Sequence, residues 1–179
     1  MNIKRLSIIF SLCIVSAGFL VCLLIYILFF YDTQQRKGNY EVARILGLSK
    51  VTVLSSDYSY DPFVIRDYDI IEVYQLSCNS IHDFVSCSSF ELYDEYYKDV
   101  FILKSNWHKT PINFEKCSEM LDMAFGQRQN EKRNKWIAEM YQILVSDYGY
   151  YAFYYSESEV ALYVLNTNNG KLYIMYLNP

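Results

Sequence analysis

Hydrophobic residues form one long uncharged block near the start of the chain and shorter, regularly spaced groups after it. The block runs from Leu6 to Phe30, 25 residues without a charge. As a helix it would reach roughly 37 Å, more than the ~30 Å hydrocarbon thickness of a bilayer. Lys4 and Arg5 precede it, and aromatic residues gather at its far end, where rings favour the membrane interface. The pattern predicts a single-pass membrane anchor in residues 1–31, followed by a polar linker in residues 32–38.

A cleaved secretion signal is the alternative interpretation of this block, because such signals also begin with basic residues and continue with an apolar core. Cleavage after Ala17 would leave the apolar residues 19–30 facing water, so we expect a retained anchor. The short basic N-terminal tail favours an N-terminus inside and a domain outside the membrane, in the periplasm or the extracellular space.

Small residues share one face of the predicted anchor helix, namely Ser7, Ser11, Gly18 and Cys22. A stripe of this kind lets two helices approach closely and would support a homodimer. Single-pass helices also carry such residues without associating, so both outcomes remain open.

Residues 39–179 are predicted to form one α+β domain. Its first half gives weak signals: a short helix that ends at Gly47, strands at 51–54 and 68–76, helices at 80–87 and 90–98, and a strand at 99–104. The second half is clearer. Thr110-Pro111 predicts the start of a helix that ends at Gly126, and a second helix has one apolar face from Trp136 to Val145. A three-stranded antiparallel meander then follows at 150–155, 160–166 and 171–177, with a hairpin turn at Asn169-Gly170.

The last two predicted strands are apolar on both faces, whereas a sheet with one solvated face should alternate. One face can pack on the two preceding helices. The other face needs further structure, a partner or a membrane to cover it, or it remains as a tyrosine-rich surface.

Tyrosine is the most unusual part of the composition, with 19 residues in a chain of 179. Exposed tyrosine combines a large contact area with a low entropy cost and is enriched in binding surfaces. We therefore predict a protein-binding surface on the sheet. Its predicted members are Tyr151, Tyr154, Tyr155, Tyr163, Tyr173 and Tyr176. The competing interpretation treats these tyrosines as ordinary strand residues around a small core.

The charge balance argues against nucleic acid as a partner. Without Lys4 and Arg5, the chain carries 14 basic and 20 acidic residues, and the sequence pI is about 5.2. Four aspartates lie among tyrosines in the first half of the domain, at positions 57, 61, 67 and 69. Their spacing does not match an EF-hand loop, so we expect solvated carboxylates, which could also meet a basic partner.

Candidate catalytic motifs are few, and we predict a non-enzymatic protein with no cofactor. The best chemical cluster contains Cys78, His82 and Cys87. It could hold a metal if His108 or Cys117 supplied a fourth ligand, or it could provide a Cys–His nucleophile. In an exported domain, a disulfide between Cys78 and Cys87 is the simpler expectation.

These features predict a membrane-tethered recognition domain that binds another protein through its tyrosine-rich sheet or its acidic loops. An inhibitor or immunity-type role would fit by analogy only. The alternatives are a structural subunit of a membrane complex, and an enzyme or metal site around Cys78, His82 and Cys87.

Overall fold

The computed structural model describes residues 18–23, 25, 38–64, 67–87, 90–92, 103–126 and 131–178. The chain divides into two compact units, Met1–Gly38 and Asn39–Pro179. In the first unit, the described residues 18–23 and 25 are helical. No helix in the described ranges has both the length and the apolar character needed to cross a bilayer. Most of the predicted anchor, including Ser7 and Ser11, lies outside those ranges.

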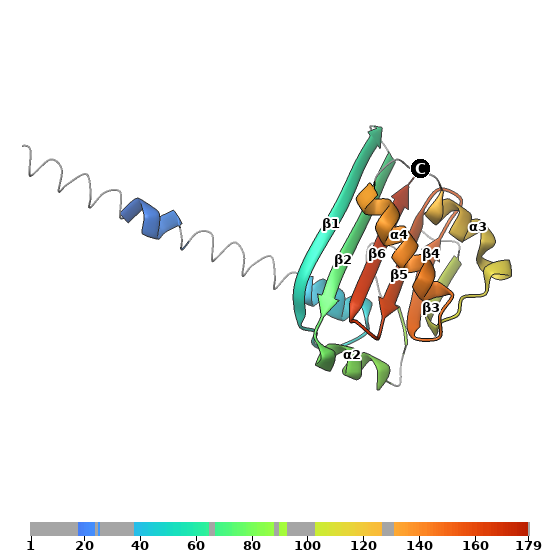
Figure 1. Cartoon of the computed structure of the whole chain (residues 1–179), viewed down its shortest axis with the longest axis horizontal. Coiled ribbons are helices and arrows are strands. Elements are labelled where there is room, and N and C mark those ends of the chain that lie inside the picture. The colour runs from blue at the N-terminus through green and yellow to red at the C-terminus, as the bar shows by residue number, and fades with distance from the viewer. Residues whose placement is uncertain are drawn as a thin grey trace, which may run out of the picture. The chain divides into compact units, whose positions relative to one another are not determined.

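The second unit is built on a six-stranded antiparallel sheet with the strand order β1-β2-β6-β5-β4-β3 (Figure 1). The strands are β1 (Val53–Val64), β2 (Asp67–Leu76), β3 (Leu103–Lys109), β4 (Gly149–Tyr155), β5 (Val160–Asn166) and β6 (Lys171–Asn178). The helices are α2 (Cys78–Val85), α3 (Phe114–Phe125) and α4 (Glu131–Leu144), and residues 39–45 are also helical. The predicted α+β class and the C-terminal meander are confirmed.

Helices of the same unit cover both faces of this sheet. On one face, α3 and α4 pack on alternate residues of β2, β4, β5 and β6; α4 crosses in front of the strands in Figure 1. On the other face, the helical residues 39–45 and Phe84 of α2 pack on the intervening residues. Every residue of β5 is buried as a result. The apolar character of both strand faces is therefore explained by the chain's own helices, without a partner.

Local capping decides where α2 and α3 begin. The Ser77 side chain accepts a hydrogen bond from the N–H of Ser80, so α2 begins at Cys78, two residues before the predicted start. Asn113 caps α3 in the same way, through the N–H of Lys116. The predicted start at Thr110-Pro111 is wrong because Thr110 instead exchanges hydrogen bonds with Gly149 at the start of β4.

Four other predictions differ from the structure. Strand β3 continues to Lys109, five residues beyond the predicted end at Lys104. Strand β1 continues to Val64, ten residues beyond the predicted end at Leu54. Residues 90–92 are not helical, and the rest of the predicted helix at 90–98 lies outside the described ranges. The β5–β6 connection is a four-residue turn over residues 167–170, in which Gly170 alone has a positive φ. The predicted two-residue turn needed positive φ at Asn169 as well.

Candidate functional site

The predicted tyrosine surface is largely inside the domain. Four of its six members are at most 8% exposed, namely Tyr151, Tyr154, Tyr163 and Tyr173. Tyr155 and Tyr176 are half-buried. Two of the buried hydroxyls have hydrogen-bond partners within the chain: that of Tyr154 donates to the carbonyl oxygen of Leu92 at 3.3 Å, and that of Tyr173 donates to Glu139. These tyrosines build the two cores and do not form an open binding face, because helices cover both sides of the sheet.

The cysteine cluster is also dispersed by the fold. Cys78 is the first residue of α2, Cys87 follows its end, and both are free thiols. Cys78 and Cys87 lie at opposite ends of α2, whose length of about 10 Å exceeds the ~7 Å between Cα atoms that a disulfide can bridge. Among the residues that the structure describes, which include His82 and His108, no three His, Cys, Asp or Glu side chains lie together as metal ligands would.

Alkylation of the full chain without reductant should therefore label both Cys78 and Cys87. Helix α2 separates the two thiols, so each should appear by peptide mass spectrometry as a modified cysteine. The half-buried Cys117 serves as an internal reference, because burial raises the pKa of its thiol and should slow its reaction. Recovery of a peptide pair linked through Cys78 and Cys87 would contradict the position of α2.

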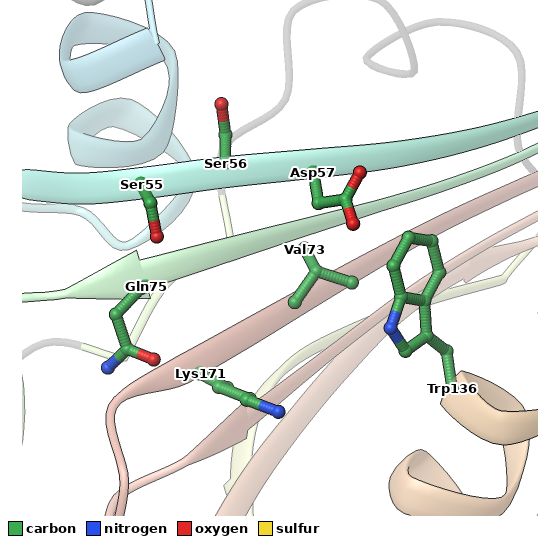
Figure 2. Close-up of a pocket in the computed structure, with 7 residues that line it drawn as sticks. All are labelled: Ser55, Ser56, Asp57, Val73, Gln75, Trp136 and Lys171. Atoms are coloured by element: carbon green, nitrogen blue, oxygen red, sulfur yellow. The ribbon is translucent and has the colours of Figure 1, made fainter. Parts of the chain in front are cut away.

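A pocket of about 200 Å³ opens between β1 and α4 (Figure 2). We call it the β1 pocket, and its lining residues are Ser55, Ser56, Asp57, Val73, Gln75, Trp136 and Lys171. Strands β1, β2 and β6 supply all of them except Trp136, which comes from α4. Residues from four elements thus meet beside the outermost strand of the sheet.

Strand register brings the polar groups of this pocket onto one face. The paired rows are Ser55–Gln75–Lys171 and Asp57–Val73–Tyr173. Directly paired residues of antiparallel strands place their side chains on the same face. Val73 and Tyr173 belong to the core beneath α3 and α4, so both rows face α4. Ser56 points to the opposite side, as Figure 2 shows.

Helix α4 presents Lys132, Trp136 and Glu139 to these rows, since spacings of four and three place residues on one helix face. The Nζ atom of Lys132 lies 2.7 Å from Oδ1 of Asp57 and 4.8 Å from the centre of the Trp136 ring. Glu139 accepts a hydrogen bond from the Tyr173 hydroxyl, and its Oε2 atom lies 3.3 Å from Nζ of Lys171. One ion pair therefore joins α4 to β1, and a second joins it to β6.

The outer edge of β1 is partly covered by the first ion pair. The N–H of Tyr58 donates to Oδ1 of Asp57 at 2.9 Å, and its carbonyl oxygen accepts from Lys132 at 3.3 Å. Neither backbone group of Tyr58 is therefore directed at β2. Backbone groups along a strand alternate sides with a period of two, so Ser56 directs its N–H and carbonyl to the same outer edge.

Both carboxylates are held in the charged form. The hydrogen bond from Lys132 lowers the pKa of Asp57 below its ordinary value. Burial acts to raise the pKa of Glu139, but the hydrogen bonds from Tyr173 and Lys171 outweigh it, and the net pKa is lowered. A general acid or base needs a pKa near the working pH, so neither group suits that role. Both carboxylates therefore act as fixed negative charges in these contacts.

Replacing Glu139 with glutamine should remove a pH-dependent part of the stability. Because the folded pKa lies below the unfolded value of about 4.3, this contribution is present above that pH and is lost as the pH falls through the folded pKa. We expect the free energy of unfolding to fall by about 1 kcal/mol at pH 7, a value discounted for partial exposure of the pair. Urea denaturation measures the free energy of unfolding of the variant and of the unaltered chain at pH 7 and at pH 3.5. The difference between the two chains should be smaller at pH 3.5.

The exposed Glu119 on α3 provides the matched control for this change. Glu119→Gln removes the same charge and should change the free energy of unfolding at pH 7 by no more than about 0.5 kcal/mol. A Glu139→Gln chain that retained the full acid sensitivity would show that the contact with Tyr173 and Lys171 does not stabilise the fold.

No family model, no curated protein and no solved structure matches the chain. The function is therefore inferred from the geometry of the β1 pocket and its surroundings.

Sequence reasoning missed the β1 pocket although it discussed several of its residues. It placed Asp57 among solvated loop carboxylates and Trp136 on an apolar helix face, and it gave Lys132 no role. Arg133, the residue after Lys132 on α4, is 1% exposed. The available signal was the four-residue spacing of Lys132 and Trp136, which predicts an ammonium group beside an indole ring on one face of a helix.

Proposed function

We propose that this chain is a membrane-tethered, exported, non-enzymatic recognition domain that binds an extended segment of another protein along the outer edge of β1. The observation that carries the proposal is the position of β1. In the described part of the sheet, β1 has β2 on one side and no strand on the other. A strand edge that no other strand covers offers its outward backbone groups, here those of Ser56, to an incoming strand, and a neighbouring pocket adds side-chain selectivity.

Two properties of β1 support this use. Its pairing with β2 is regular from Ser55 to Asp61, so no bulge interrupts the outer edge over that stretch. Leu54 and Tyr58 are 57% and 69% exposed, which leaves apolar area on the edge strand for a partner to cover. The β1 pocket opens beside the same stretch.

Site-specific photo-crosslinking in cells tests the proposal. A benzoylphenylalanine at position 54 of the full chain should give a discrete adduct with another protein. The same residue at position 103 is the matched control, because Leu103 lies on the other edge strand, β3, and is similarly exposed at 49%. Equal adducts from both positions, or none from position 54, would contradict recognition along β1.

A proline at position 56 separates strand pairing from simple proximity. Ser56→Pro removes an outward N–H without breaking a β1–β2 hydrogen bond, and proline is tolerated at such edge positions. The adduct from position 54 should therefore be lost while the domain stays folded. Retention of the adduct at full yield would show that the partner does not add a strand to β1.

The proposed tether rests on the uncharged block from Leu6 to Phe30. If it anchors the chain, deletion of residues 6–30 should release the protein from carbonate-washed membranes. Alkaline phosphatase fused after Pro179 should be active if the domain is exported, whereas an active fluorescent-protein fusion with inactive phosphatase would place the domain inside.

A structural role in a membrane complex is the second candidate, and an exposed patch on α3, on α4 and at the residue after α4 favours it. Phe114, Tyr141 and Val145 are 36%, 46% and 45% exposed, and the first two rings lie 5.7 Å apart. Native sizing after extraction in mild detergent distinguishes the two. A stable complex that Tyr141→Glu disrupts, while Ser56→Pro leaves it intact, would favour the structural role.

A further inference from the structure

Three groups from two elements converge on a single ammonium group in this structure. The Nζ atom of Lys132 lies 2.7 Å from Oδ1 of Asp57, 3.3 Å from the carbonyl oxygen of Tyr58 and 4.8 Å from the centre of the Trp136 ring. A carboxylate, a carbonyl and an aromatic face are the groups that a primary ammonium prefers, through charge-assisted hydrogen bonds and a cation–π contact. We call these three groups the ammonium site.

The lysine that fills the ammonium site is replaceable. The side chains of Lys132 and Asp57 are 48% and 58% exposed, so water and salt compete with their contact. Exposed ion pairs contribute little net stability, because the Coulomb attraction is screened and ordering a long side chain costs entropy. An ammonium group from another molecule could therefore displace Lys132.

The β1 pocket gives such a group a route to the same carboxylate. Asp57 and Trp136 belong both to the pocket lining and to the ammonium site. Figure 2 shows the Ser55 hydroxyl and the Gln75 side chain on the same side of the strands as Trp136. A side chain that entered over β1 would cross this polar space and reach Asp57 beside the indole ring.

The charge of the surrounding hairpin indicates the sign of the partner. Residues 53–76 contain five acidic residues and one basic residue. An extended segment that carries lysine would meet complementary charge along β1, and complementary charge raises association rates and selects the partner.

We propose that the ammonium site recognises a lysine side chain of the protein segment bound along β1, and that Lys132 occupies this site in the free protein. This inference rests on the proposed function, since the lysine belongs to the segment that pairs with β1. The lowered pKa of Asp57 is consistent with it, because the carboxylate stays charged at neutral pH.

Fluorine NMR on the full chain in detergent micelles tests the site directly. The sequence contains two tryptophans, Trp107 and Trp136, so fluorotryptophan labelling gives two resonances, which a Trp136→Phe variant assigns. The probe is acetyl-Gly-Lys-Gly-amide, and the control peptide carries norleucine in place of lysine. The lysine peptide should shift the Trp136 resonance saturably. Its affinity should be about fivefold higher in Lys132→Ala, because the resident ammonium no longer competes.

Matched variants make the result specific. Lys116→Ala removes the same charge from α3 and should leave the affinity unchanged. Asp57→Asn, added to Lys132→Ala, should abolish the saturable shift, while an unmoved Trp107 resonance reports that the fold is intact. Equal binding of the norleucine peptide, no gain in Lys132→Ala, or retained binding in the double variant would each overturn the proposal. The crosslink from position 54 does not use this probe, so its outcome judges the proposed function separately.

Discussion

Tyr163→Ala is expected to lower the free energy of unfolding by about 3–5 kcal/mol, the range for removing a large aromatic side chain from a packed core. Tyr163 lies in the middle of β5 and is 0% exposed. Its ring meets those of Trp107 and Tyr154 edge to face, each at 6.3 Å between centroids. Alanine would leave a cavity at this place. The neighbouring rings are fixed by their strands and cannot move in to fill it. Urea denaturation of the full chain in detergent, followed by tryptophan fluorescence, measures the loss.

Tyr58 on β1 supplies the matched control, because its side chain is 69% exposed. Tyr58→Ala should change the free energy of unfolding by no more than about 0.5 kcal/mol. The comparison separates a core role for meander tyrosines from the surface role that the sequence alone predicts. If Tyr163→Ala proved as mild as Tyr58→Ala, Tyr163 would have to be accessible, and the covering of this sheet face would be wrong.

Gly170→Val is expected to destabilise the domain by about 2–4 kcal/mol, for two additive reasons. Gly170 has a φ of +72°, which a β-branched residue adopts only with strain. A Cβ atom there would also lie 2.6 Å from Cδ1 of Ile81 and 3.0 Å from the carbonyl oxygen of Leu76. The backbone cannot easily move away, because the carbonyl oxygen of Gly170 accepts a hydrogen bond from the N–H of Leu76 at 2.8 Å. The same denaturation experiment gives the value.

Asn168→Val tests whether any valine in this turn is harmful. Asn168 is exposed in the same connection and does not have a positive φ, so we expect a change below about 0.5 kcal/mol. Similar losses of stability from both variants would mean that this turn rejects valine at any position. The close approach of Ile81 in α2 would then not explain why position 170 is glycine.

The sequence was informative where local periodicity and burial coincide. The meander strands carry continuous runs of β-forming residues and could be predicted to within a residue or two. The apolar face of α4 was predicted from Trp136, although the helix begins five residues earlier, at Glu131. Strand β1 could not, because its serines, aspartates and Pro62 resemble a loop. It is a strand because β2 pairs with it along almost its whole length, which is a tertiary effect that local sequence does not report.

The candidate site was harder to predict for the same reason. Asp57 and Lys132 are 75 positions apart in the chain, and only the strand order and the placement of α4 bring them together. The tyrosine excess led to a wrong expectation, because it predicted an exposed binding surface where most of the predicted tyrosines are buried. Tyrosine is enriched both in interfaces and in amphipathic cores, so its abundance alone does not distinguish the two. The tyrosines of one sheet face are core residues because the helical residues 39–45 and α2 cover that face.

The central place of β6 has a consequence for how the protein is made. Until residues 171–178 are available, the β1–β2 hairpin and the β3–β4–β5 ribbon have no strand to connect them. A nascent chain that has left the ribosome as far as β5 therefore exposes two incomplete sheet halves. Closure then requires pairing between β2 and β6, about a hundred positions apart, which is a slow, non-local step. If the domain is exported, residues 171–178 have to be translocated before the sheet can close.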